Sequence, residues 1–415
     1  MLLSFRFENF RSFKEEQELS MVAGSGKEKP ETLIHTAGFD EAVLPISATY
    51  GANASGKSNI LRALRFMVDA VKFSHARWKP DKGVSREPYA GSGAEVPSSF
   101  AVDFLDRDSD IRYQYSFSVN NEAVLEEWLY AYPKGKRQMW FTRSAGKPTD
   151  FGEKLTGDNR VIENLTRPNS LFLSAAAQNN HKMLSPVYRW FSGSINFLLG
   201  DRSEWQQRTG TLCEDAGNRG LIVQMLRSAD LGIADLRVER KSFEDKIPPN
   251  SFSAILEILR PIRLVHQVGD RNEVFSEDQE SAGTLAYLAL LGPLITAIRE
   301  GGIVCIDELD SSLHPHLALQ LIRLFNDKAS SPKGAQLIFN THDTNLLSSG
   351  ELRRDEIWFT EKRPDGVSQL YSLSDFKPRK EENLENGYLQ GRYGAIPFMN
   401  AREFLTAIGA QHETA

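Results

Sequence analysis

The sequence predicts an α/β fold with a parallel core sheet, an antiparallel β layer and a mainly helical insertion. Three observations support this prediction. A glycine-rich turn separates an apolar run that ends at Tyr50 from a stretch of helical periodicity that begins at Asn59. Apolar and polar residues alternate between positions 99 and 132, as in antiparallel strands. In the last third, short apolar runs alternate with helical patterns, which is typical of a parallel sheet.

Residues 1–180 are expected to form the N-terminal half of the fold. The pattern predicts strands over 2–7 and 45–50, a helix over 59–73, a loop over 76–98 and antiparallel strands over 99–132. Within the last segment, Asn120 and Asn121 are typical of a hairpin turn. The antiparallel strands cannot belong to a parallel sheet, so we expect them to form a second layer packed beside it.

Residues 181–275 are predicted to be a mainly helical insertion. Between Ser185 and Phe275, twelve Lys and Arg balance twelve Asp and Glu, whereas a DNA-gripping arm is normally biased towards basic residues. No heptad repeat persists there, so a long coiled coil is not expected. Residues 276–415 return to α/β character, with predicted helices over 285–299 and 312–325, strands over 302–306 and 335–339, a hairpin over 357–359 and 368–373, and a polar tail.

The composition is that of an ordinary globular protein. The chain has 415 residues, of which 40% are hydrophobic and 25% charged, so collagen-like and wholly disordered classes are excluded. Its net charge of −6 does not suggest a protein that mainly coats nucleic acid. Two cysteines and eight histidines without ligand spacing predict neither a disulfide framework nor a metal cluster. The N-terminus lacks a signal-peptide pattern, and the longest apolar run, 285–298, is too short to span a bilayer, so we expect a cytoplasmic protein with no membrane partner.

Residues 51–58 match the pattern G-x-x-x-x-G-K-S between a predicted strand and a predicted helix, the context of a phosphate loop. The alternative is a glycine turn with an ordinary surface lysine, which leaves the matching flanks unexplained. Backbone N–H groups of such a loop converge on phosphate oxygens. Lys57 is expected to reach the β- and γ-phosphates, and Ser58 to bind Mg²⁺. The predicted nucleotide-binding residues here are Gly51, Ala52, Asn53, Ala54, Ser55, Gly56, Lys57, Ser58 and Asn59.

A second group of candidates lies at the end of the apolar run 302–306. Asp307 follows that predicted strand, where its carboxylate can lie beside the phosphate loop and hold magnesium. Glu308 is the candidate general base for an attacking water. Alone, an Asp-Glu pair after a strand is equally a pair of solvated acids. His342 follows the next predicted strand and can face the γ-phosphate, although a histidine in such a place is more often structural.

Three weaker candidate places in the sequence each allow two interpretations. Ser281 and Gly283 begin the apolar helix; they form either a simple helix cap or a phosphate-binding helix N-terminus. Gln178 follows an apolar run and is either a site residue or an ordinary surface glutamine. Asp310 follows the carboxylate pair and either organises a dimer contact or caps a helix.

The order of these motifs resembles that of ABC-type ATPases of the SMC/RecF/OLD branch. The resemblance rests on N-F-R-S-F at 9–13, the phosphate loop, E-S-A-G-T at 280–284, I-D-E at 306–308 and T-H at 341–342. Three further stretches, 167–178, 309–315 and 388–397, are similar to AbiLi-type abortive-infection ATPases. Only 223 positions separate Ser58 from Ser281, too few for the long coiled coil of SMC proteins. The 74 residues after Thr341 are too few for the nuclease domain of OLD proteins.

This resemblance implies a homodimer, or a larger homo-oligomer, in which two ATP molecules and Mg²⁺ lie between two copies. Ser281 and Gly283 would then complete the partner's phosphate loop. The same resemblance makes Gln178 a magnesium-sensing residue, Asp310 the D-loop residue, and Arg11 or Ser12 a neighbour of the nucleotide. It also implies ATP hydrolysis that gates a conformational change.

The resemblance leads to three functional hypotheses. In the first, the chain is a nucleotide-gated sensor and scaffold that controls a separate effector, such as a Toprim-like or RloB-like nuclease, in bacterial anti-phage defence. In the second, it is a RecF-like DNA-binding ATPase of DNA repair or processing, which predicts DNA-stimulated hydrolysis. The third, a stand-alone NTPase, does not explain the 181–275 insertion. The balanced charge of the insertion favours the first, and DNA remains a possible partner.

Overall fold

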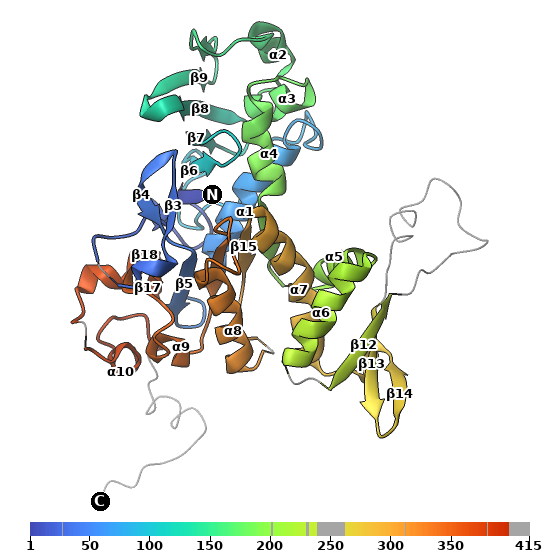
Figure 1. Cartoon of the computed structure of the whole chain (residues 1–415). Helices are drawn as coiled ribbons and strands as arrows, with labels where there is room; N and C mark the ends of the chain where they lie inside the picture. The colour runs from blue at the N-terminus through green and yellow to red at the C-terminus, as the bar shows by residue number, and fades with distance from the viewer. Residues whose placement is uncertain are drawn as a thin grey trace, which may run out of the picture.

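The fold is built from two β-sheets, a parallel-rich one and an antiparallel one, with helices packed on both (Figure 1). The computed structural model describes residues 1–26, 28–200, 202–229, 232–238, 262–311, 313–379 and 381–397. In Figure 1 the antiparallel sheet lies at the top, the parallel sheet lies below it, and a helical region with a small third sheet extends to the lower right. The predicted α/β fold class is therefore confirmed.

The core sheet has six strands in the order β11-β15-β16-β5-β17-β18, and its first five strands are parallel. Its short strands are apolar and nearly fully buried, as expected for a sheet covered on both faces. β18 pairs with β17 in the antiparallel sense and closes the edge. The strands are β11 (Ile195–Leu198), β15 (Ile303–Ile306), β16 (Gln336–Asn340), β5 (Ile46–Gly51), β17 (Ile357–Lys362) and β18 (Ser368–Ser372).

The second sheet is antiparallel throughout, with the order β10-β9-β8-β7-β6-β1-β2. The alternating segment 99–132 forms three of its strands, and Asn120 and Asn121 lie in the β7–β8 turn, as predicted. The N-terminal strand joins the same sheet between β2 and β6. The strands are β1 (Leu2–Glu8), β2 (Gln17–Ser20), β6 (Ser98–Asp106), β7 (Ile111–Val119), β8 (Val124–Tyr132), β9 (Gln138–Ser144) and β10 (Asp150–Phe151).

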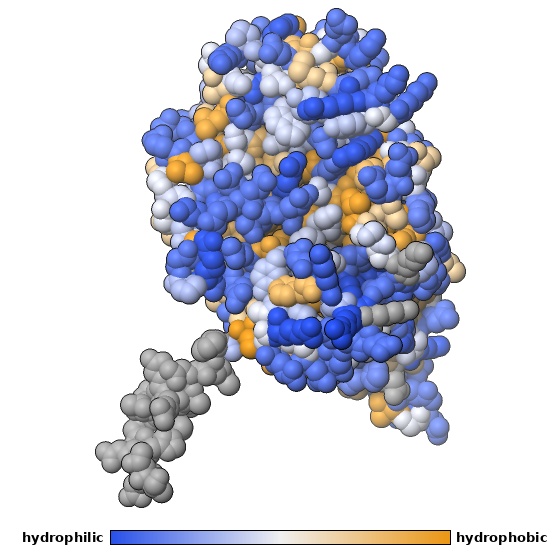
Figure 2. Space-filling view, turned by 90° about the vertical axis from the view of Figure 1, so that its left-hand side faces the viewer, coloured by the Kyte–Doolittle hydropathy of each residue, from blue (hydrophilic) through white to orange (hydrophobic). Residues whose placement is uncertain are grey.

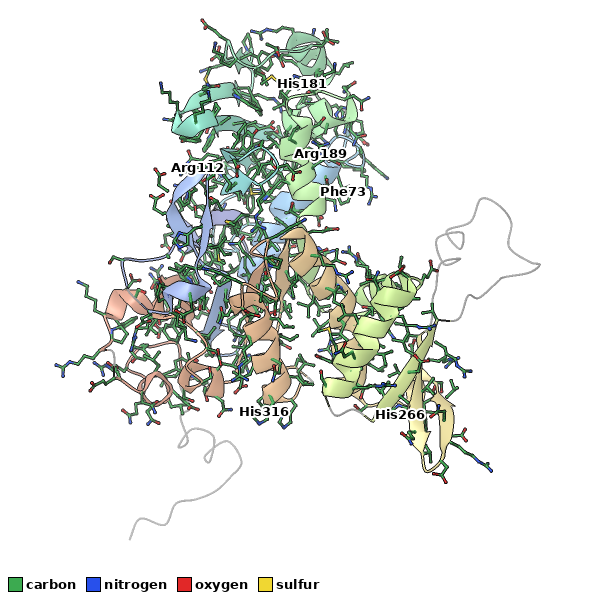
Figure 3. All side chains as sticks on the ribbon, in the orientation of Figure 1. Phe73, Arg112, His181, Arg189, His266 and His316 are labelled. Atoms are coloured by element: carbon green, nitrogen blue, oxygen red, sulfur yellow. The ribbon has the colours of Figure 1, made fainter. Side chains whose placement is uncertain are left out.

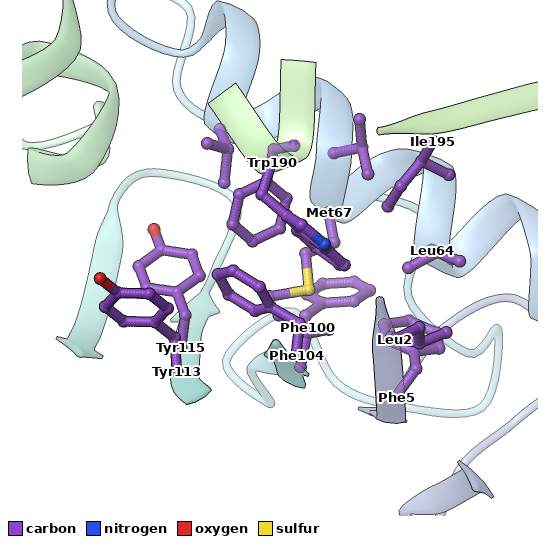
Figure 4. Close-up of a cluster of buried hydrophobic side chains, with 14 of the residues drawn as sticks. Leu2, Phe5, Leu64, Met67, Phe100, Phe104, Tyr113, Tyr115, Trp190 and Ile195 are labelled. Atoms are coloured by element: carbon purple, nitrogen blue, oxygen red, sulfur yellow. The ribbon is translucent and has the colours of Figure 1, made fainter. Parts of the chain in front are cut away.

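One face of the antiparallel sheet packs against helices to form a core rich in aromatic residues (Figure 4). Phe104 stacks on Trp190 with ring centroids 4.0 Å apart, and Met67 of α1 lies in the same cluster. The helices on this face are α1 (Lys57–Phe73), α3 (Phe172–Gln178) and α4 (Ser185–Gly193), while α2 (Asn159–Leu165) contacts α3. α1 therefore contributes to this core along its length and to the nucleotide site at its N-terminus.

A buried glutamine joins the two sheets. Gln336 begins β16 of the core sheet, and its side chain is fully buried. It accepts a hydrogen bond from the N–H of Leu2 at 2.7 Å and donates to the carbonyl oxygens of Leu2 (2.9 Å) and Leu44 (3.2 Å). The amide thus satisfies backbone groups of the antiparallel sheet from within the parallel one.

The segment 181–275 is helical only in part. It contains α4, α5 (Ser203–Leu212) and α6 (Ala216–Ser228), as predicted. It also contains four strands that we did not predict: β11 in the core sheet, and β12 (Ile233–Val238), β13 (Ile262–Val268) and β14 (Arg271–Phe275) in a three-stranded sheet. Gly269 and Asp270 form the two-residue turn between β13 and β14, a hairpin signal that the sequence does carry. Residues 239–261 of this segment lie outside the described part of the chain.

The apolar helix α7 (Ala282–Glu300) is longer than the run 285–298 that the sequence marks. By length and composition it could cross a membrane, and it is the one such helix in the described residues, yet 67% of its most apolar window is buried within the fold. Pro293 lies inside it, and Thr209 of α5 accepts a hydrogen bond from the Gly292 N–H at 3.0 Å and donates one to the Ala289 carbonyl at 3.1 Å. Since proline has no N–H to offer that carbonyl, Thr209 supplies the missing donor.

The remaining elements lie at the periphery of the core sheet. The predicted helix 312–325 is α8, which begins three residues late because Pro315 takes its first helical position. The others are the hairpin strands β3 (Ile34–Thr36) and β4 (Phe39–Val43), and the short helices α9 (Asn345–Ser348) and α10 (Leu384–Leu389). α8 itself spans Pro315–Asn326. Of the polar tail, residues 398–415 lie outside the described part.

Candidate nucleotide-binding site

The phosphate-loop segment 51–58 connects the carboxyl end of β5 to the N-terminus of α1 in the conformation that only glycine accommodates easily. Gly51 and Gly56 have φ of +156° and +115°. A Cβ on Gly56 would lie 2.8 Å from Ser368 Oγ, and one on Gly51 would clash with the Thr360 carbonyl. Ser55 Oγ lies 2.6 Å from Thr360 Oγ1, which ties the loop to β17. The loop therefore forms a concave turn at a helix N-terminus, the geometry that suits a phosphate group.

Lys57 lies under this loop. Its Nζ donates hydrogen bonds to the carbonyl oxygens of Gly51 (2.8 Å) and Ala52 (3.1 Å), and the residue is 7% exposed. Burial lowers its pKa, while the nearby carboxylates of Asp307 and Glu308 act in the opposite direction. The lysine is thus held at the loop by carbonyl groups, and phosphate oxygens can compete for the same ammonium group.

Ser58 and Asp307 meet although 249 positions separate them. Ser58 Oγ donates to Asp307 Oδ1 at 2.9 Å, and the same carboxylate oxygen accepts a hydrogen bond from Asn340 Nδ2 at 2.9 Å. Asn340 is 1% exposed, and its Oδ1 has no hydrogen-bond partner. The Ser58 hydroxyl and the Asp307 carboxylate are hard oxygen donors of the kind that Mg²⁺ prefers, and the Asn340 amide orients that carboxylate, so the residues present fit this ion.

Glu308, Asp310 and His342 surround this cluster. Glu308 has φ of +56° and an exposed side chain, a backbone conformation that is uncommon for a residue with a Cβ and often found at functional sites. Asp310 Oδ1 accepts hydrogen bonds from Thr341 Oγ1 (2.7 Å) and from the His342 N–H (3.1 Å). The surrounding protein lowers the pKa of His342, and the charge of Lys57 acts in the same direction. The neutral imidazole is therefore the favoured form at neutral pH.

The turn at Arg11 lies beside the start of α1. Asn59 Nδ2 donates to Ser12 Oγ at 2.9 Å, and Ser12 also approaches Gly56. The Arg11 guanidinium itself pairs with Glu87, with Nη2 2.6 Å from Oε2. The structure thus brings this turn to the phosphate loop, with the Arg11 side chain held by an acid.

Gln178 is not brought to the loop. α3 begins next to the C-terminal end of α1, where the Leu171 N–H donates to Ser74 Oγ at 3.1 Å. α1 has 17 residues and is therefore about 25 Å long, whereas α3 covers only about 10 Å. His181, just after Gln178, lies near the top of the view in Figure 3, away from the core sheet. This position does not suit the magnesium-binding role that the resemblance implied, because the structure places Gln178 far from Ser58.

A different loop occupies the space next to Ser58. β11 pairs with β15 in parallel, so its carboxyl end reaches the same edge as Asp307, and Gly200 and Arg202 follow it. Together with Ser58 and Asp307 they line a pocket of about 500 Å³. Arg202 Nη2 donates to the Ser311 carbonyl at 2.8 Å. Sequence reasoning missed both this loop and Asn340, since each depends on strand order rather than on a local motif.

Ser281 caps α7 and is exposed. Its Oγ accepts a hydrogen bond from the Thr284 N–H at 3.0 Å, and Gly283 is half-buried in the same turn. Farther along α7, Ala286 and Leu290 line the pocket beside Ser58, but Ser281 does not. Within the described residues, then, α7 passes close to the phosphate loop, while Ser281 at its N-terminus does not line the chain's own site.

Comparison with known protein families identifies the chain. Residues 46–348 match the family described as "AAA domain, putative AbiEii toxin, Type IV TA system", which covers most of the chain. The chain belongs to this family. It is thus an AAA-domain protein, which agrees with the loop and carboxylate geometry above. The AbiLi-type relationship is a finer assignment, to which the comparisons do not extend.

No curated protein matched the sequence of this AAA domain protein. Solved structures with some similarity include the SmcHead bound to the C-winged helix domain of ScpA, with 16% identity, a TM-score of 0.46 and coverage of 90% of this chain and 99% of that one. The SMC head domain from Thermotoga maritima has 13% identity, a TM-score of 0.39 and coverage of 89% and 98%. The Smc head domain of Pyrococcus furiosus, bound to the C-terminal domain of ScpA, has 14% identity, a TM-score of 0.40 and coverage of 91% and 97%.

Proposed function

We propose that this AAA domain protein binds and hydrolyses ATP and acts in the cytoplasm as a nucleotide-gated sensor and scaffold that controls a separate effector in anti-phage defence. The observation that carries the ATPase proposal is the contact of Ser58 with Asp307 at 2.9 Å, directly beside the buried Lys57 and the strained Glu308. Two sequence-distant motifs meet there in the arrangement that phosphoryl transfer to water requires.

Each residue of the site has a definite chemical role in this proposal. The amides of the 51–58 loop and Lys57 bind and orient the phosphates, and Ser58 and Asp307 hold Mg²⁺. The ion, when bound, neutralises charge that develops on the phosphate oxygens. Glu308 orients a water molecule and accepts its proton at the carboxylate. His342, held by Asp310, faces the same space with a neutral imidazole.

The exposed N-terminus of α7 supports action as a dimer. Ser281 and Gly283 present a hydroxyl and helix amides, a combination that suits a phosphate group, but the chain's own phosphate loop does not use them. We infer that they serve the loop of a second copy, so that two ATP molecules lie between two protomers. Larger assemblies built from such dimers are compatible with this arrangement.

The effector-controlling role rests on the family match. The matched family carries the name of a toxin from a type IV toxin–antitoxin system, which favours a function exerted through a second protein. ATP-dependent dimerisation would supply the two states that such control needs. A Toprim-like or RloB-like nuclease is the kind of effector we propose, and a RecF-like role in DNA processing is the alternative.

The decisive experiment uses Glu308→Gln, which should bind ATP yet lose about 10²- to 10⁴-fold in turnover because the base is gone. With ATP and Mg²⁺ it should accumulate as a stable dimer or larger oligomer by light scattering. Affinity purification of this variant from the native host, followed by mass spectrometry and nucleic-acid staining, then separates the two roles. A stoichiometric protein partner supports the sensor, whereas DNA alone supports the RecF-like role. Normal turnover would remove Glu308 as the base.

The dimer can be tested separately by mixing two inactive variants. Lys57→Ala inactivates the phosphate loop of its own chain. Ser281→Arg blocks the N-terminus of α7, which we propose meets the phosphate loop of the partner. In a mixed dimer, the intact loop of one chain meets the intact Ser281 of the other, so activity should partly return. If the mixture stays as inactive as its components, the two halves of the site do not lie in different chains.

A further inference from the structure

The outer face of the antiparallel sheet carries three aromatic side chains in a row. Trp128, Tyr130 and Tyr132 alternate along β8 with the buried residues Leu129 and Ala131, so they point away from the helix-covered side. They are half-buried, and the β3–β4 hairpin reaches the Tyr132 end of the row, where the Arg112 guanidinium lies 5.1 Å from the Phe39 ring centroid. We call these three residues the aromatic row.

Neighbouring strands extend the same face. The register places Thr142 opposite Trp128, Met139 opposite Tyr130, and Arg112 opposite Tyr132. The rings of Trp128 and Tyr130 lie 5.2 Å apart at 55°, and both residues are half-buried. Met139 is 37% exposed beside them. The face thus offers a strip of polarisable surface one strand long.

Positive groups lie over and beside the aromatic row. The Arg137 guanidinium lies 3.9 Å from the Tyr130 ring centroid, and that of Arg112 lies 4.9 Å from Tyr132. Arg137 belongs to the β8–β9 turn, which also carries Lys134 and Lys136 and no acid, all three exposed. We call these three residues the basic turn.

Acidic groups lie at both ends of the aromatic row. Asp40, Glu41 and Asp110 line a pocket together with Tyr132 and Lys134. Asp103 is neutralised by Arg112, whose Nε donates to it at 2.8 Å. Glu126 lies at the opposite end of the aromatic row from the basic turn. In Figure 2, which shows the left-hand side of Figure 1, the upper part of this face has pale residues among strongly hydrophilic ones. Figure 3 labels Arg112 on the same side.

We propose that this face binds single-stranded nucleic acid, with bases stacked on the aromatic row and on Arg137, and phosphates held by the basic turn. Stacking on aromatic rings and guanidinium planes is sequence-tolerant because every base has a π-face. Exposed antiparallel sheets that present aromatic residues in this way stack two or three bases in RNA-binding modules. The three exposed cations of the basic turn favour a polyanion over an apolar protein partner.

This inference goes beyond the proposed ATPase function and does not depend on it. The aromatic row lies on the other sheet from the phosphate loop, so the two sites can be tested independently. If nucleic acid is the ligand, single-stranded phage or host nucleic acid becomes a candidate signal for the nucleotide-gated state. DNA and RNA share the stacking and phosphate chemistry, and the test distinguishes them.

The experiment measures fluorescence anisotropy of a labelled oligothymidylate and the matching oligouridylate with the full chain, without nucleotide. Tyr130→Leu should weaken binding about tenfold, while Tyr130→Phe, which keeps the ring, should bind as wild type. Replacing Lys134 and Lys136 by Gln should reduce the salt slope by about 0.7 per lost phosphate contact. Tighter binding of oligouridylate identifies RNA, and tighter binding of oligothymidylate identifies DNA.

Matched controls make the result specific. Phe376→Ala removes an aromatic residue that is 42% exposed elsewhere, and Lys362→Gln removes an exposed lysine at the end of β17; neither should change affinity. Circular dichroism and thermal melting confirm that each variant folds. The proposal is overturned if wild type binds neither oligonucleotide, or if Tyr130→Leu binds as tightly as Tyr130→Phe. Equal losses in the Phe376 or Lys362 controls overturn it as well.

Discussion

Two regions of this protein present chemistry in opposite ways. At the carboxyl edge of the parallel sheet, polar side chains from three strands and a helix contact one another, and Asp307 alone accepts hydrogen bonds from Ser58 and Asn340. On the outer face of the antiparallel sheet, Trp128 and Tyr130 lie side by side and half-buried. The first region is organised by mutual hydrogen bonds before any ligand arrives. The second is a surface whose binding partners must come from outside.

The difference has a physical origin in how each sheet type is covered. Parallel strands are buried on both faces, so their functional groups can emerge only where strands end, and all of them end at one edge. An antiparallel sheet can leave one face in solvent, so alternate residues remain available along the whole strand. A nucleotide site with directional chemistry suits the edge, and a sequence-tolerant stacking surface suits the face.

The largest expected effect tests whether the two regions are independent. Lys57→Ala should abolish ATP hydrolysis and strongly weaken nucleotide binding, because no other described cation donates within the loop. Binding of labelled oligothymidylate to the outer face should remain unchanged in the same variant. The two measurements are nucleotide binding by calorimetry and anisotropy of the oligonucleotide. If oligonucleotide binding falls together with nucleotide binding, the regions are coupled and the comparison fails.

A smaller effect is expected at Asn340, which acts through Asp307. Asn340→Ala removes the amide that orients the carboxylate, and loss of such an outer partner typically costs about 10- to 100-fold in metal affinity or activity. The Mg²⁺ concentration needed to enhance ATP binding should rise correspondingly, while ATP binding in EDTA should not change. Asn326→Ala, which removes an amide on α8 that bonds the Glu351 carbonyl, serves as the control. An unaltered Mg²⁺ dependence would show that Asn340 is structural only.

The sequence predicted the edge of the parallel sheet well because its signals are local. Residues 51–58 form a contiguous motif, Asp307 directly follows an apolar run, and His342 lies three positions after another. Asn340 directly follows that second run, but its importance arises only when β16 lies between β15 and β5. Gln178 was assigned from resemblance, and the distance along α1 argues against that role.

The aromatic row, by contrast, could not be predicted from local sequence signals. The alternation in β8 was recognised as strand pattern, but which side faces solvent depends on the register and on the helices that cover the other side. Likewise β11 is a short apolar run whose membership of the core sheet depends on pairing with β15. Strand pairing between distant segments is what single-sequence patterns do not contain.

The third prediction concerns the link between the two sheets. Gln336→Leu deprives the Leu2 N–H and two carbonyl groups of their buried partner, and an unsatisfied buried group costs about 1 to 3 kcal/mol. Urea unfolding should show this loss of stability. Nucleotide affinity at the far end of β16 should stay the same in the variant at temperatures where it is folded. Two separate unfolding transitions would mean that the amide also keeps the sheets cooperative, whereas an unchanged midpoint would show that other contacts suffice.

The last prediction concerns the opposite edge of the parallel sheet, where Glu356 precedes β17. Its carboxyl is fully buried, Oε2 accepts from the Arg353 N–H at 2.8 Å, and burial raises its pKa to about 8. The folded state holds this proton more tightly than the unfolded state, in which the pKa of the group is near 4.5. The contribution of the bound proton to stability is therefore fully present below pH 4.5 and is lost as the pH rises towards 8. Between these two values the free energy of unfolding falls by at most about 1.4 kcal/mol per pH unit.

Glu356→Gln cannot ionise, so this contribution to the slope should vanish and the variant should gain stability relative to wild type most clearly near pH 8. Chemical denaturation at several pH values between 5 and 8 measures the difference. The neighbouring Asp355→Asn, which instead weakens the ion pair with Arg353 at 2.7 Å, should lower stability without removing the slope. Parallel pH curves for wild type and Glu356→Gln would place the titrating group elsewhere. The expected divergence would show that this sheet keeps a destabilising buried acid at one edge while the opposite edge, with its hydrogen-bonded Asp307, remains poised for a ligand.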